Sequence, residues 1–369
     1  MTGYREDQLQ DVSKRFQIYG EILHAEPCKI GHINETYTAT YAQGGVKVRY
    51  IHQKINRHVF KSPDEVMENL VRVTTHIRSR LEAEAAEDVT RKVLIVVPTR
   101  DGNSYFINDE GDFWRTFVFV EGVQSYEAVE SKSQAYEAGV AFGAFQHYLA
   151  DLPGSRLHET IPNFHHSRNR FDALTTAVKK DKLNRATNAS RELDFCHQNE
   201  AMVDVILKGM AAGEIPERVT HNDTKFNNVM MDRQSGKAMC VVDLDTVMPG
   251  SVLYDFGDMV RTTTSPTLED ERDLTRVEMQ MPIFQELARG YVSTAGGFLT
   301  PNEKALLAFS GKLIAFTIGL RFLTDYLEGD HYFRVHRAGH NLDRARTQFK
   351  LVESIIRQEE EMQAFVNSL

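Results

Sequence analysis

The feature that most constrains this chain is a polar loop enclosed by two apolar segments. Residues 221–228 read HNDTKFNN, of the form H-x-D-x-x-x-x-N, and residues 240–245 read CVVDLD. Asp223 and Asn228 therefore share one tight loop, and Asp243 follows Asp223 by 20 residues at the end of an apolar run. A strand that returns beside the loop brings these three side chains together, which predicts a compact β-containing unit over residues 218–245.

Phosphoryl transfer requires groups of these kinds at about this separation. One carboxylate orients and deprotonates the acceptor hydroxyl, while an amide oxygen and a second carboxylate hold Mg²⁺ against the phosphates. The pattern assigns the first role to Asp223 and the metal to Asn228 and Asp243, and Asp245 can share a second ion. The alternative is an ordinary turn around His221 and an ordinary cap at the strand end. Any single H-x-D string occurs by chance, but the whole combination rarely does.

A second string, Asp255-Phe256-Gly257, spells the magnesium motif of protein kinases. It lies 32 residues after Asp223, too far for that role, and Asp243 already occupies the expected place. We therefore interpret it as a chance match and expect Asp255 to brace the 221–228 loop through hydrogen bonds. His221 is then expected to be a structural imidazole, with a role as general base as the alternative.

The first third of the chain has the pattern of a small sheet with one long helix. β-Branched and aromatic residues predict strands, and a run of helix formers without internal glycine or proline predicts the helix. The expected elements are a hairpin over 36–51 with its turn at 42–45, a helix over 63–87, a buried strand over 92–98, and a strand pair formed by 104–107 and 113–120.

Downstream of Gly122 the pattern becomes mostly helical. Ser131 caps a segment whose Ala and Phe residues recur at helical spacing, and only 218–245 returns to β structure. The sequence thus predicts a bilobal α+β fold, with a small β-rich N-terminal lobe over 1–121 and a larger α-helical C-terminal lobe over 122–369, linked near 119–123. A cleft between such lobes is a preferred place for a ligand.

Composition and cysteine usage narrow the function classes. The formal charge is −9 and no long Lys/Arg stripe is present, which argues against nucleic acid as a partner, because phosphate neutralisation requires clustered cations. Cys28, Cys196 and Cys240 are odd in number and far apart, which fits a reducing compartment and disfavours a zinc site. We expect a cytoplasmic protein without membrane contact, since no apolar signal region is present and apolar runs are shorter than the ~20 residues of a membrane span.

These strings together resemble the aminoglycoside phosphotransferase and choline kinase superfamily, whose members are relatives of protein kinases. The resemblance rests on the H-x-D-x-x-x-x-N and V-D-L-D pair, on the YDFGD string at 254–258 and on the lobe order. The chain is more closely similar to the N-acetylhexosamine 1-kinases, over segments spread along most of its length. These segments are 31–34, 164–171, 220–225, 243–251, 321–323 and 325–332.

The resemblance implies a protein-kinase-like fold, Mg²⁺, and ATP as the co-substrate. It also implies transfer of a phosphoryl group to the anomeric hydroxyl of an N-acetylhexosamine (GlcNAc or GalNAc). The nucleotide contacts that it implies are Gly31, His32, Asn34 and Lys225, with Phe119 and Glu121 in the linker offering backbone groups to adenine.

On the acceptor side, the resemblance implies sugar contacts at Arg321, Tyr332 and His32. Sugar recognition requires hydrogen-bonding side chains around the hydroxyls together with an apolar or aromatic surface, and these residue types supply both. By spacing alone, Arg321 and Asp325 are i and i+4 on a helix, so a surface salt bridge between them is the alternative.

The phosphate-binding region departs from the usual kinase pattern at two places. Residues 27–34 read PCKIGHIN and keep only Gly31 where the family usually carries more glycine. In residues 50–54, YIHQK, Gln53 takes the place of the lysine that pairs with the α- and β-phosphates in most kinases, and Lys54 follows it. Successive side chains of a strand face opposite ways, so Lys54 is expected to point away from the nucleotide.

Two other functions are compatible with the sequence. One is a small-molecule kinase of the same superfamily that acts on an amino alcohol, an amino acid or an aminoglycoside. The other is a nucleotide-binding pseudokinase, which the altered glycine loop and the displaced lysine suggest. The complete set of Asp223, Asn228 and Asp243 argues against the pseudokinase.

Overall fold

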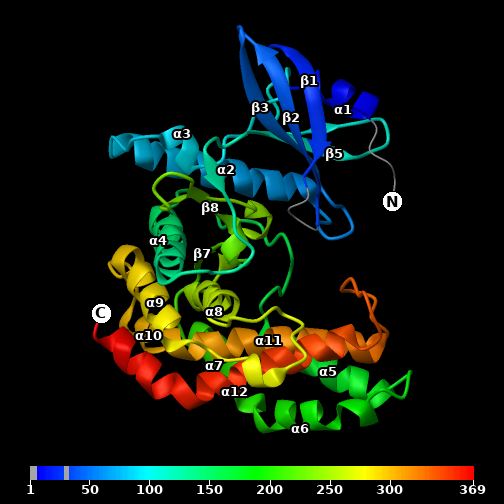
Figure 1. Cartoon of the computed structure of the whole chain (residues 1–369), viewed down its shortest axis with the longest axis vertical. Coiled ribbons are helices and arrows are strands. Elements are labelled where there is room, and N and C mark those ends of the chain that lie inside the picture. Colours follow the sequence, from blue (N-terminus) through cyan, green and yellow to red (C-terminus); the bar gives the residue numbers. More distant parts are fainter. Residues whose placement is uncertain (1–5, 29–32) are drawn as a thin grey trace.

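The computed structural model describes residues 6–28 and 33–369. Figure 1 shows a twisted sheet at one end of the molecule and a body of helices at the other, with a smaller β region between them. The predicted α+β class, with a β-rich N-terminal lobe and an α-helical C-terminal lobe, is confirmed. The site expected around 221–245 belongs to the region where the two lobes meet.

The N-terminal lobe is built on one antiparallel sheet. The predicted hairpin over 36–51 is confirmed, and its turn is formed by Gly44 and Gly45, whose φ angles of 58° and 86° suit glycine. The short helix α1 (Glu6–Ser13) precedes this sheet. The strands, in their order across the sheet, are β1 (Glu21–Pro27), β2 (Glu35–Gln43), β3 (Val46–Lys54), β5 (Phe113–Val118) and β4 (Phe106–Ile107).

The strand predicted over 92–98 is wrong. Residues up to Lys92 form the short helix α3 (Val89–Lys92), and the segment that follows makes one isolated bridge, between Val96 and Phe117. The Val97 N–H still donates to the Thr116 carbonyl at 2.8 Å, so the segment runs along the edge of β5. Helix α3 ends only at Lys92, and Pro98 has no N–H to donate. Few residues between them are therefore free to form the hydrogen bonds of a strand.

The long helix α2 (Pro63–Ala83) joins the two lobes through a shared core. It begins at Pro63 as predicted and ends four residues before the predicted 87. Its buried Leu70 and Val73 belong to the same apolar cluster as Phe145 and Leu244, which are residues of the C-terminal lobe. The lobes are therefore packed against each other through α2.

The small β region connects the lobes along the chain. The chain leaves the N-terminal sheet at Val118 and enters the C-terminal lobe at β6 (Val123–Gln124), which pairs with β8 (Val229–Asp232). The division at 121/122 stays a prediction. The other strands here are β9 (Ala238–Val241), which pairs with β8, and β7 (Arg218–Thr220), which pairs with β10 (Met248–Gly250).

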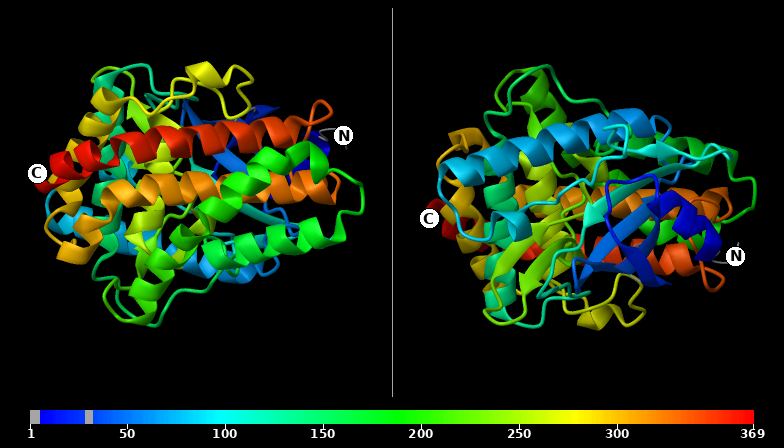
Figure 2. Two further views of the ribbon diagram at one scale, coloured as in Figure 1. Left: turned by 90° about the horizontal axis from the view of Figure 1, so that it is seen from below. Right: turned by 90° about the horizontal axis from the view of Figure 1, so that it is seen from above.

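The C-terminal lobe is a body of packed helices. Ser131 caps α4 (Lys132–Leu149) as predicted, since its side chain accepts from the Gln134 N–H. Figure 2 shows α11 (Leu307–Glu328) and α12 (His340–Asn367) side by side along the lobe. The other helices are α5 (Ser167–Lys180), α6 (Ser190–Gln198), α7 (Val205–Ala211), α8 (Val252–Thr263), α9 (Met281–Ala295) and α10 (Pro301–Ala305).

Helix α11 is the most apolar of the long helices. Within residues 6–28 and 33–369, it alone is long and apolar enough to cross a membrane by length and composition. However, 78% of its apolar window is buried inside the protein, against helices such as α8 and α12. This burial is typical of a core helix.

Helices α4 and α9 approach each other so closely that only glycine fits at their contact. A Cβ atom on Gly290 would lie 2.0 Å from the Tyr136 carbonyl oxygen. We predict that Gly290→Ala lowers the free energy of unfolding by about 1–3 kcal/mol, because the helices must separate. Gly297→Ala is the control, since a Cβ atom on Gly297 would have no neighbour within 4 Å. Denaturant unfolding measures both variants, and equal stability would contradict the packing.

Candidate active site

The loop that carries Asp223 runs from β7 to β8 and is held by a buried carboxylate. The N–H groups of His221 and Asn222 donate to the Asp255 carboxylate at 2.9 and 2.7 Å. The Thr224 hydroxyl donates to the Asp255 carbonyl oxygen at 2.6 Å. The predicted brace is therefore confirmed. Asp255 holds residues 221, 222 and 224, where the loop begins.

The Asp255-Phe256-Gly257 string is part of helix α8 and not of a loop. A Cβ atom on Gly257 would lie 2.4 Å from a carbonyl oxygen of α11, so this glycine permits close helix packing. The Asp255 carboxylate also accepts from Gln146 at 2.7 Å, and Gln146 accepts from the Tyr291 hydroxyl at 2.6 Å. Burial raises the pKa of Asp255. These contacts support the loop from the helical core.

His221 is bonded to backbone groups through both ring nitrogens. Its Nδ1 atom accepts from the Asp223 N–H at 3.2 Å, so Nε2 carries the proton and donates to the Val242 carbonyl at 3.0 Å. The rings of Phe142 and Phe145 contact the imidazole edge-on. The prediction of a structural imidazole is confirmed, because both nitrogens are engaged.

Asp223 lies beside two partners from its own loop. The Asn228 side-chain amide donates to the Asp223 carbonyl at 2.8 Å, and Lys225 Nζ lies 2.9 Å from Asp223 Oδ2. Burial alone raises the pKa of this carboxyl, but the charge and hydrogen bond of Lys225 outweigh it and hold the pKa of Asp223 below its usual value. Asp223 is therefore ionised at neutral pH, which is the state that accepts a hydroxyl proton.

Asp243 follows β9 in a left-handed backbone conformation, with φ 60° and ψ 57°. Such a conformation is strained for a residue with a side chain and is common at functional sites. Asp243 is exposed. The protein atoms around it, together with the charges of Asp245 and Asp223, raise the pKa of Asp243 to about 7. The two neighbouring carboxylates thus have pKa values shifted in opposite directions.

Asn228 and Asp243 fit a Mg²⁺ ion by the chemistry of their donors. The Asn228 amide nitrogen is bonded to Asp223, so its Oδ1 oxygen lies on the opposite side, and the Val242 N–H bonds the Asn228 carbonyl at 2.9 Å. Mg²⁺ is typically held by one or two protein oxygens completed by phosphates and water. Among the described residues, no group of three or more His, Cys, Asp or Glu is placed to hold a metal ion.

Asp245 is not available to a second ion, so this part of the prediction is corrected. Its two oxygens accept from the Arg115 guanidinium at 2.5 and 2.9 Å, and Asn34 Nδ2 donates to it at 2.6 Å. Asp245 is 1% exposed. A buried carboxylate that is bound at both oxygens by a guanidinium is already charge-compensated, which disfavours a second cation.

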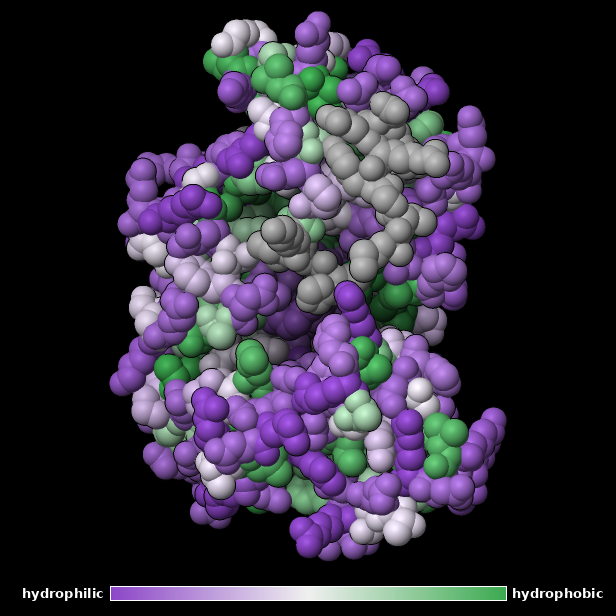
Figure 3. Space-filling model, turned by 45° about the vertical axis from the view of Figure 1, so that its right-hand side comes forward, coloured by the Kyte–Doolittle hydropathy of each residue, from purple (hydrophilic) through white to green (hydrophobic). Residues whose placement is uncertain are grey.

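The linker between the lobes keeps two backbone groups open. Phe119 N–H donates to the Arg49 carbonyl at 3.2 Å, and the Glu121 carbonyl accepts from Arg91 at 3.0 Å. In the part of the chain that the structure describes, the Phe119 carbonyl and the Glu121 N–H have no protein partner. These two groups are an acceptor and a donor two residues apart, as adenine recognition requires. Figure 3 shows a hydrophilic hollow in the surface between the two lobes.

The predicted phosphate-side residues are only partly placed. Gly31 and His32 lie outside the described residues. Asn34 uses its side chain within the protein, because its Oδ1 atom accepts from the Asn56 N–H at 2.9 Å while its amide donates to Asp245.

Lys54 points away from the site as predicted. Its Nζ atom lies 2.6 Å from Glu35 and 3.7 Å from Asp112. Gln53, on the other face of β3, accepts from Arg115 Nε at 3.0 Å. The position that carries a lysine in most kinases is therefore linked to an arginine of the neighbouring strand.

The residues expected at the acceptor side form an aromatic and guanidinium cluster. Arg321 lies over the rings of Phe164, Tyr332 and Phe333, at 5.4 to 5.6 Å from their centroids. Phe164 is followed by His165, whose Nε2 donates to the Asn222 carbonyl at 2.8 Å. Since Asn222 precedes Asp223, this chain of contacts connects Arg321 to the loop of Asp223.

Asp325 supports this cluster from within the protein. It is buried and accepts from the N–H groups of His331, Tyr332 and Phe333 at 2.8 to 2.9 Å. The alternative of a surface salt bridge between Arg321 and Asp325 is therefore wrong. Helical spacing pairs Asp325 with Arg321, but its carboxylate is used to fix the segment that carries Tyr332.

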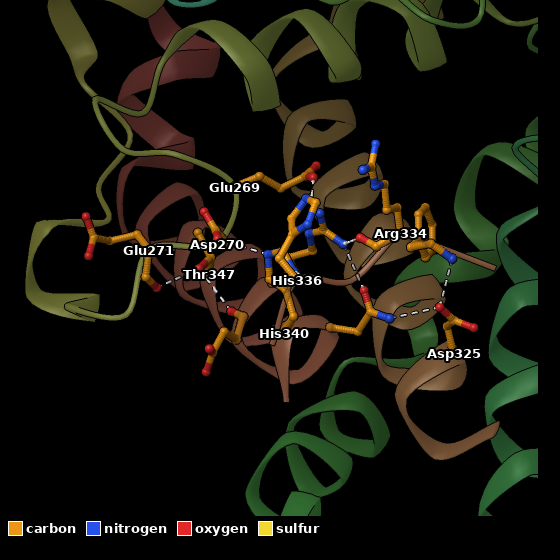
Figure 4. Close-up of polar contacts among 12 residues, drawn as sticks. Glu269, Asp270, Glu271, Asp325, Arg334, His336, His340 and Thr347 are labelled. Carbon is orange, nitrogen blue, oxygen red and sulfur yellow. Dashed lines mark hydrogen bonds and ion pairs between the residues drawn. The ribbon is translucent and has the colours of Figure 1, made fainter. Parts of the chain in front are cut away.

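The segment that carries Tyr332 is also held at its C-terminal end, through His336 and His340. The His336 N–H donates to His340 Nδ1 at 3.2 Å, so His340 Nε2 carries the proton that bonds Asp270 at 2.9 Å. Figure 4 shows Asp325 and His340 on opposite sides of the segment, with Arg334 between them. The backbone around Tyr332 is thus fixed at two points.

The sequence of residues 24–278 matches the APH family, described as a phosphotransferase enzyme family. The chain belongs to this family. The match spans well over half of the chain and includes the loop of Asp223 and the aspartate that follows β9. The phosphotransferase predicted from spacing is therefore confirmed at the level of the family.

Solved structures similar to this phosphotransferase share its fold over nearly the whole chain. A microcompartment-associated aminopropanol kinase is 15% identical with a TM-score of 0.59, covering 97% of this chain and 98% of its own. Spectinomycin phosphotransferase, solved with ADP and spectinomycin, is 12% identical with a TM-score of 0.59, covering 98% and 100%. Choline kinase from Cryptosporidium parvum is 14% identical with a TM-score of 0.59, covering 99% of both. The bilobal kinase-like fold is confirmed.

Two residues of the site were missing from the sequence prediction. Arg115 interrupts the apolar strand FWRTFV at 113–118, and a charge inside a buried strand was the signal that pointed to a partner. His165 gave no comparable signal. Burial lowers its pKa to about 4, so a neutral imidazole links Phe164 to the loop of Asp223.

We predict that Asp223→Asn lowers the turnover of this phosphotransferase by at least ~100-fold, because a positioned acid-base group is lost. Its fold and nucleotide affinity should be retained, since the amide is nearly isosteric. Asp101→Asn, at an exposed position, is the control. Steady-state kinetics and calorimetric titration with ADP measure both effects, and wild-type turnover in Asp223→Asn would remove this carboxylate from the mechanism.

Asp243 and Asp255 should separate metal binding from stability. Asp243→Ala should abolish the Mg²⁺ dependence of nucleotide binding and leave the melting temperature close to that of the wild type. Asp255→Ala should destabilise the protein by ~1–3 kcal/mol, because two buried N–H groups lose their acceptor. Calorimetry with and without Mg²⁺ distinguishes them. A loss of metal dependence in Asp255→Ala at unchanged stability would reverse the assignment.

Proposed function

We propose that this phosphotransferase transfers the γ-phosphoryl group of ATP to the anomeric hydroxyl of an N-acetylhexosamine and yields the sugar 1-phosphate. The observation that carries the choice of acceptor is a pair of guanidinium groups beside the catalytic loop. Arg170 donates to the Phe164 carbonyl at 3.1 Å, and Arg321 lies 5.6 Å from the centroid of the Phe164 ring. Burial, together with the charge of Arg321, lowers the pKa of Arg170. Among the described residues, neither arginine forms an ion pair with a carboxylate.

Uncompensated guanidinium groups favour acceptors rich in oxygen and disfavour cations. Each guanidinium offers several N–H donors in a fixed fork, which suits hydroxyl and acetamido oxygens. An ammonium group placed here would meet two like charges. The choline, aminopropanol and aminoglycoside acceptors of the structurally similar enzymes carry amino or ammonium groups, so the pair argues for a neutral sugar.

The aromatic side chains of the same cluster support a sugar ring. Phe164, Tyr332 and Phe333 surround Arg321, and Tyr332 is 68% exposed, with its hydroxyl 3.3 Å from Arg321 Nη2. The exposed face of Tyr332 is an apolar surface next to hydrogen-bond donors. This combination suits a hexose, whose faces are apolar and whose rim carries hydroxyls.

In the proposed reaction Asp223 accepts the proton of the O1 hydroxyl as O1 bonds the γ-phosphorus and the bond to ADP breaks. Lys225 keeps Asp223 ionised before the reaction and contributes positive charge beside the transferred group. Asn228 and Asp243 would hold Mg²⁺, which supplies charge stabilisation to the phosphates when bound. Phe119 and Glu121 would hold adenine through the open backbone groups of the linker.

We place this reaction in the cytosol. All three cysteines lie in the described part of the chain and are unpaired, as expected in a reducing compartment. ATP and a free hexosamine are the partners that the site requires.

A product screen tests the acceptor. With ATP and Mg²⁺, N-acetylglucosamine or N-acetylgalactosamine should give a sugar 1-phosphate signal by phosphorus NMR, and choline, aminopropanol, homoserine and kanamycin should give none. Phosphorylation of an amino-alcohol or aminoglycoside acceptor in place of the sugar would overturn the proposal while leaving the family assignment intact. Absence of any nucleotide binding would instead favour a protein without kinase activity.

Arg321→Ala tests the acceptor contact itself. It should raise KM for the sugar or lower kcat/KM by at least ~10-fold and leave KM for ATP unchanged, because the guanidinium contacts only the acceptor side. Arg357→Ala, at an exposed position of α12, is the matched control. Equal effects on both substrates would place Arg321 outside the acceptor site.

A further inference from the structure

The proposed nucleotide site has two ends that belong to different lobes. The open backbone groups of Phe119 and Glu121 follow β5 of the N-terminal sheet, and Asp243 follows β9 of the C-terminal lobe. A nucleotide that uses both ends must span the distance between them. The relative position of β5 and the Asp243 loop is therefore a condition for binding.

One buried ion pair connects these two segments directly. Arg115 belongs to β5 and lies four residues before Phe119, and Asp245 lies two residues after Asp243. Their bidentate contact of 2.5 and 2.9 Å is the fork geometry in which a guanidinium and a carboxylate bind most strongly. Each side chain is 2% exposed, so water does not weaken the pair.

Further hydrogen bonds extend the pair into both lobes. Arg115 Nε donates to Gln53 of β3, and Gln53 donates to Thr36 of β2 at 2.9 Å. On the other side the Thr160 hydroxyl donates to the Asp245 carbonyl at 2.8 Å. The contacts therefore run from the second strand of the sheet to the segment before α5.

We propose that Arg115 and Asp245 are positioning residues that set the spacing between the adenine end and the phosphate end of the nucleotide site. In this chain Gln53 occupies the usual lysine position and Lys54 is turned away. Gln53 is bonded to Arg115 of β5, and Arg115 links the sheet to the loop of Asp243 and Asp245. The pair acts through the positions of Phe119 and Asp243. This role is independent of the acceptor, so it holds whether or not the acceptor is a hexosamine.

Binding of two nucleotide ligands distinguishes this role from others. Adenosine uses only the adenine end, whereas ADP must reach both ends. Asp245→Asn and Arg115→Gln should each weaken ADP binding at least about fivefold, the lower range of coupling between two sites, and leave adenosine binding unchanged. The weakening of ADP should appear in the presence of Mg²⁺, because Asp243 would reach the phosphates through the metal. Calorimetric titration measures all four affinities in the absence of any acceptor.

Other outcomes would overturn the proposal. If Asp245 acted only as a metal ligand, Asp245→Asn would lose the gain in ADP affinity that Mg²⁺ gives, whereas Arg115→Gln would keep it. If the pair served stability alone, adenosine and ADP would weaken together or neither would change. Lys54→Met, on the opposite face of β3, is the control and should bind both ligands as the wild type does.

A double variant guards against failure to fold. Each single substitution leaves one buried charge without its partner, which is strongly destabilising, whereas Arg115→Gln with Asp245→Asn removes both charges. The double variant should show the same selective loss of ADP affinity, and no greater loss than the single variants, because both act on one contact. Additive losses would mean that Arg115 and Asp245 act separately and would contradict the proposal.

Discussion

The buried carboxylate of Asp255 is the interaction on which the rest of the site depends. It accepts the N–H groups of His221 and Asn222 at the point where β7 ends, so the loop that follows can turn without leaving buried donors unpaired. Gln146 and Tyr291 connect the same carboxylate to α4 and α9. The position of Asp223 is therefore set by the helical core, and the tight α4–α9 contact at Gly290 contributes to it.

On this support, charge divides the work between two aspartates. Lys225 lowers the pKa of Asp223, whereas enclosure and neighbouring carboxylates raise the pKa of Asp243 to about 7. The first is the proposed proton acceptor, and a cation held at the second would lower its pKa. Asp245, a third carboxylate close by, is neutralised by Arg115 and so belongs to the contact between lobes.

On the acceptor side the grouped charges are positive. Arg170 and Arg321 lie near each other beside aromatic rings, and Asp325 is turned to the backbone of 331–333 instead of neutralising them. The segment that carries Tyr332 is also fixed through His336 and His340. Rigid support with uncompensated donors is an arrangement suited to oxygen-rich acceptors, and it motivates the choice of a neutral sugar over the amines.

The sequence by itself determined the elements whose cause is local. The Gly44–Gly45 hairpin, the start of α2 at Pro63, the Ser131 cap and the spacing of Asp223, Asn228 and Asp243 all follow from neighbouring residues, and so did the fold class and the family. Two predictions from local pattern were wrong, because the partners lie elsewhere in the chain. These were the salt bridge between Arg321 and Asp325 and the strand over 92–98. Only the tertiary structure decided that Asp245 binds Arg115, 130 residues away in sequence. The role of a carboxylate depends on which groups lie beside it in the folded protein.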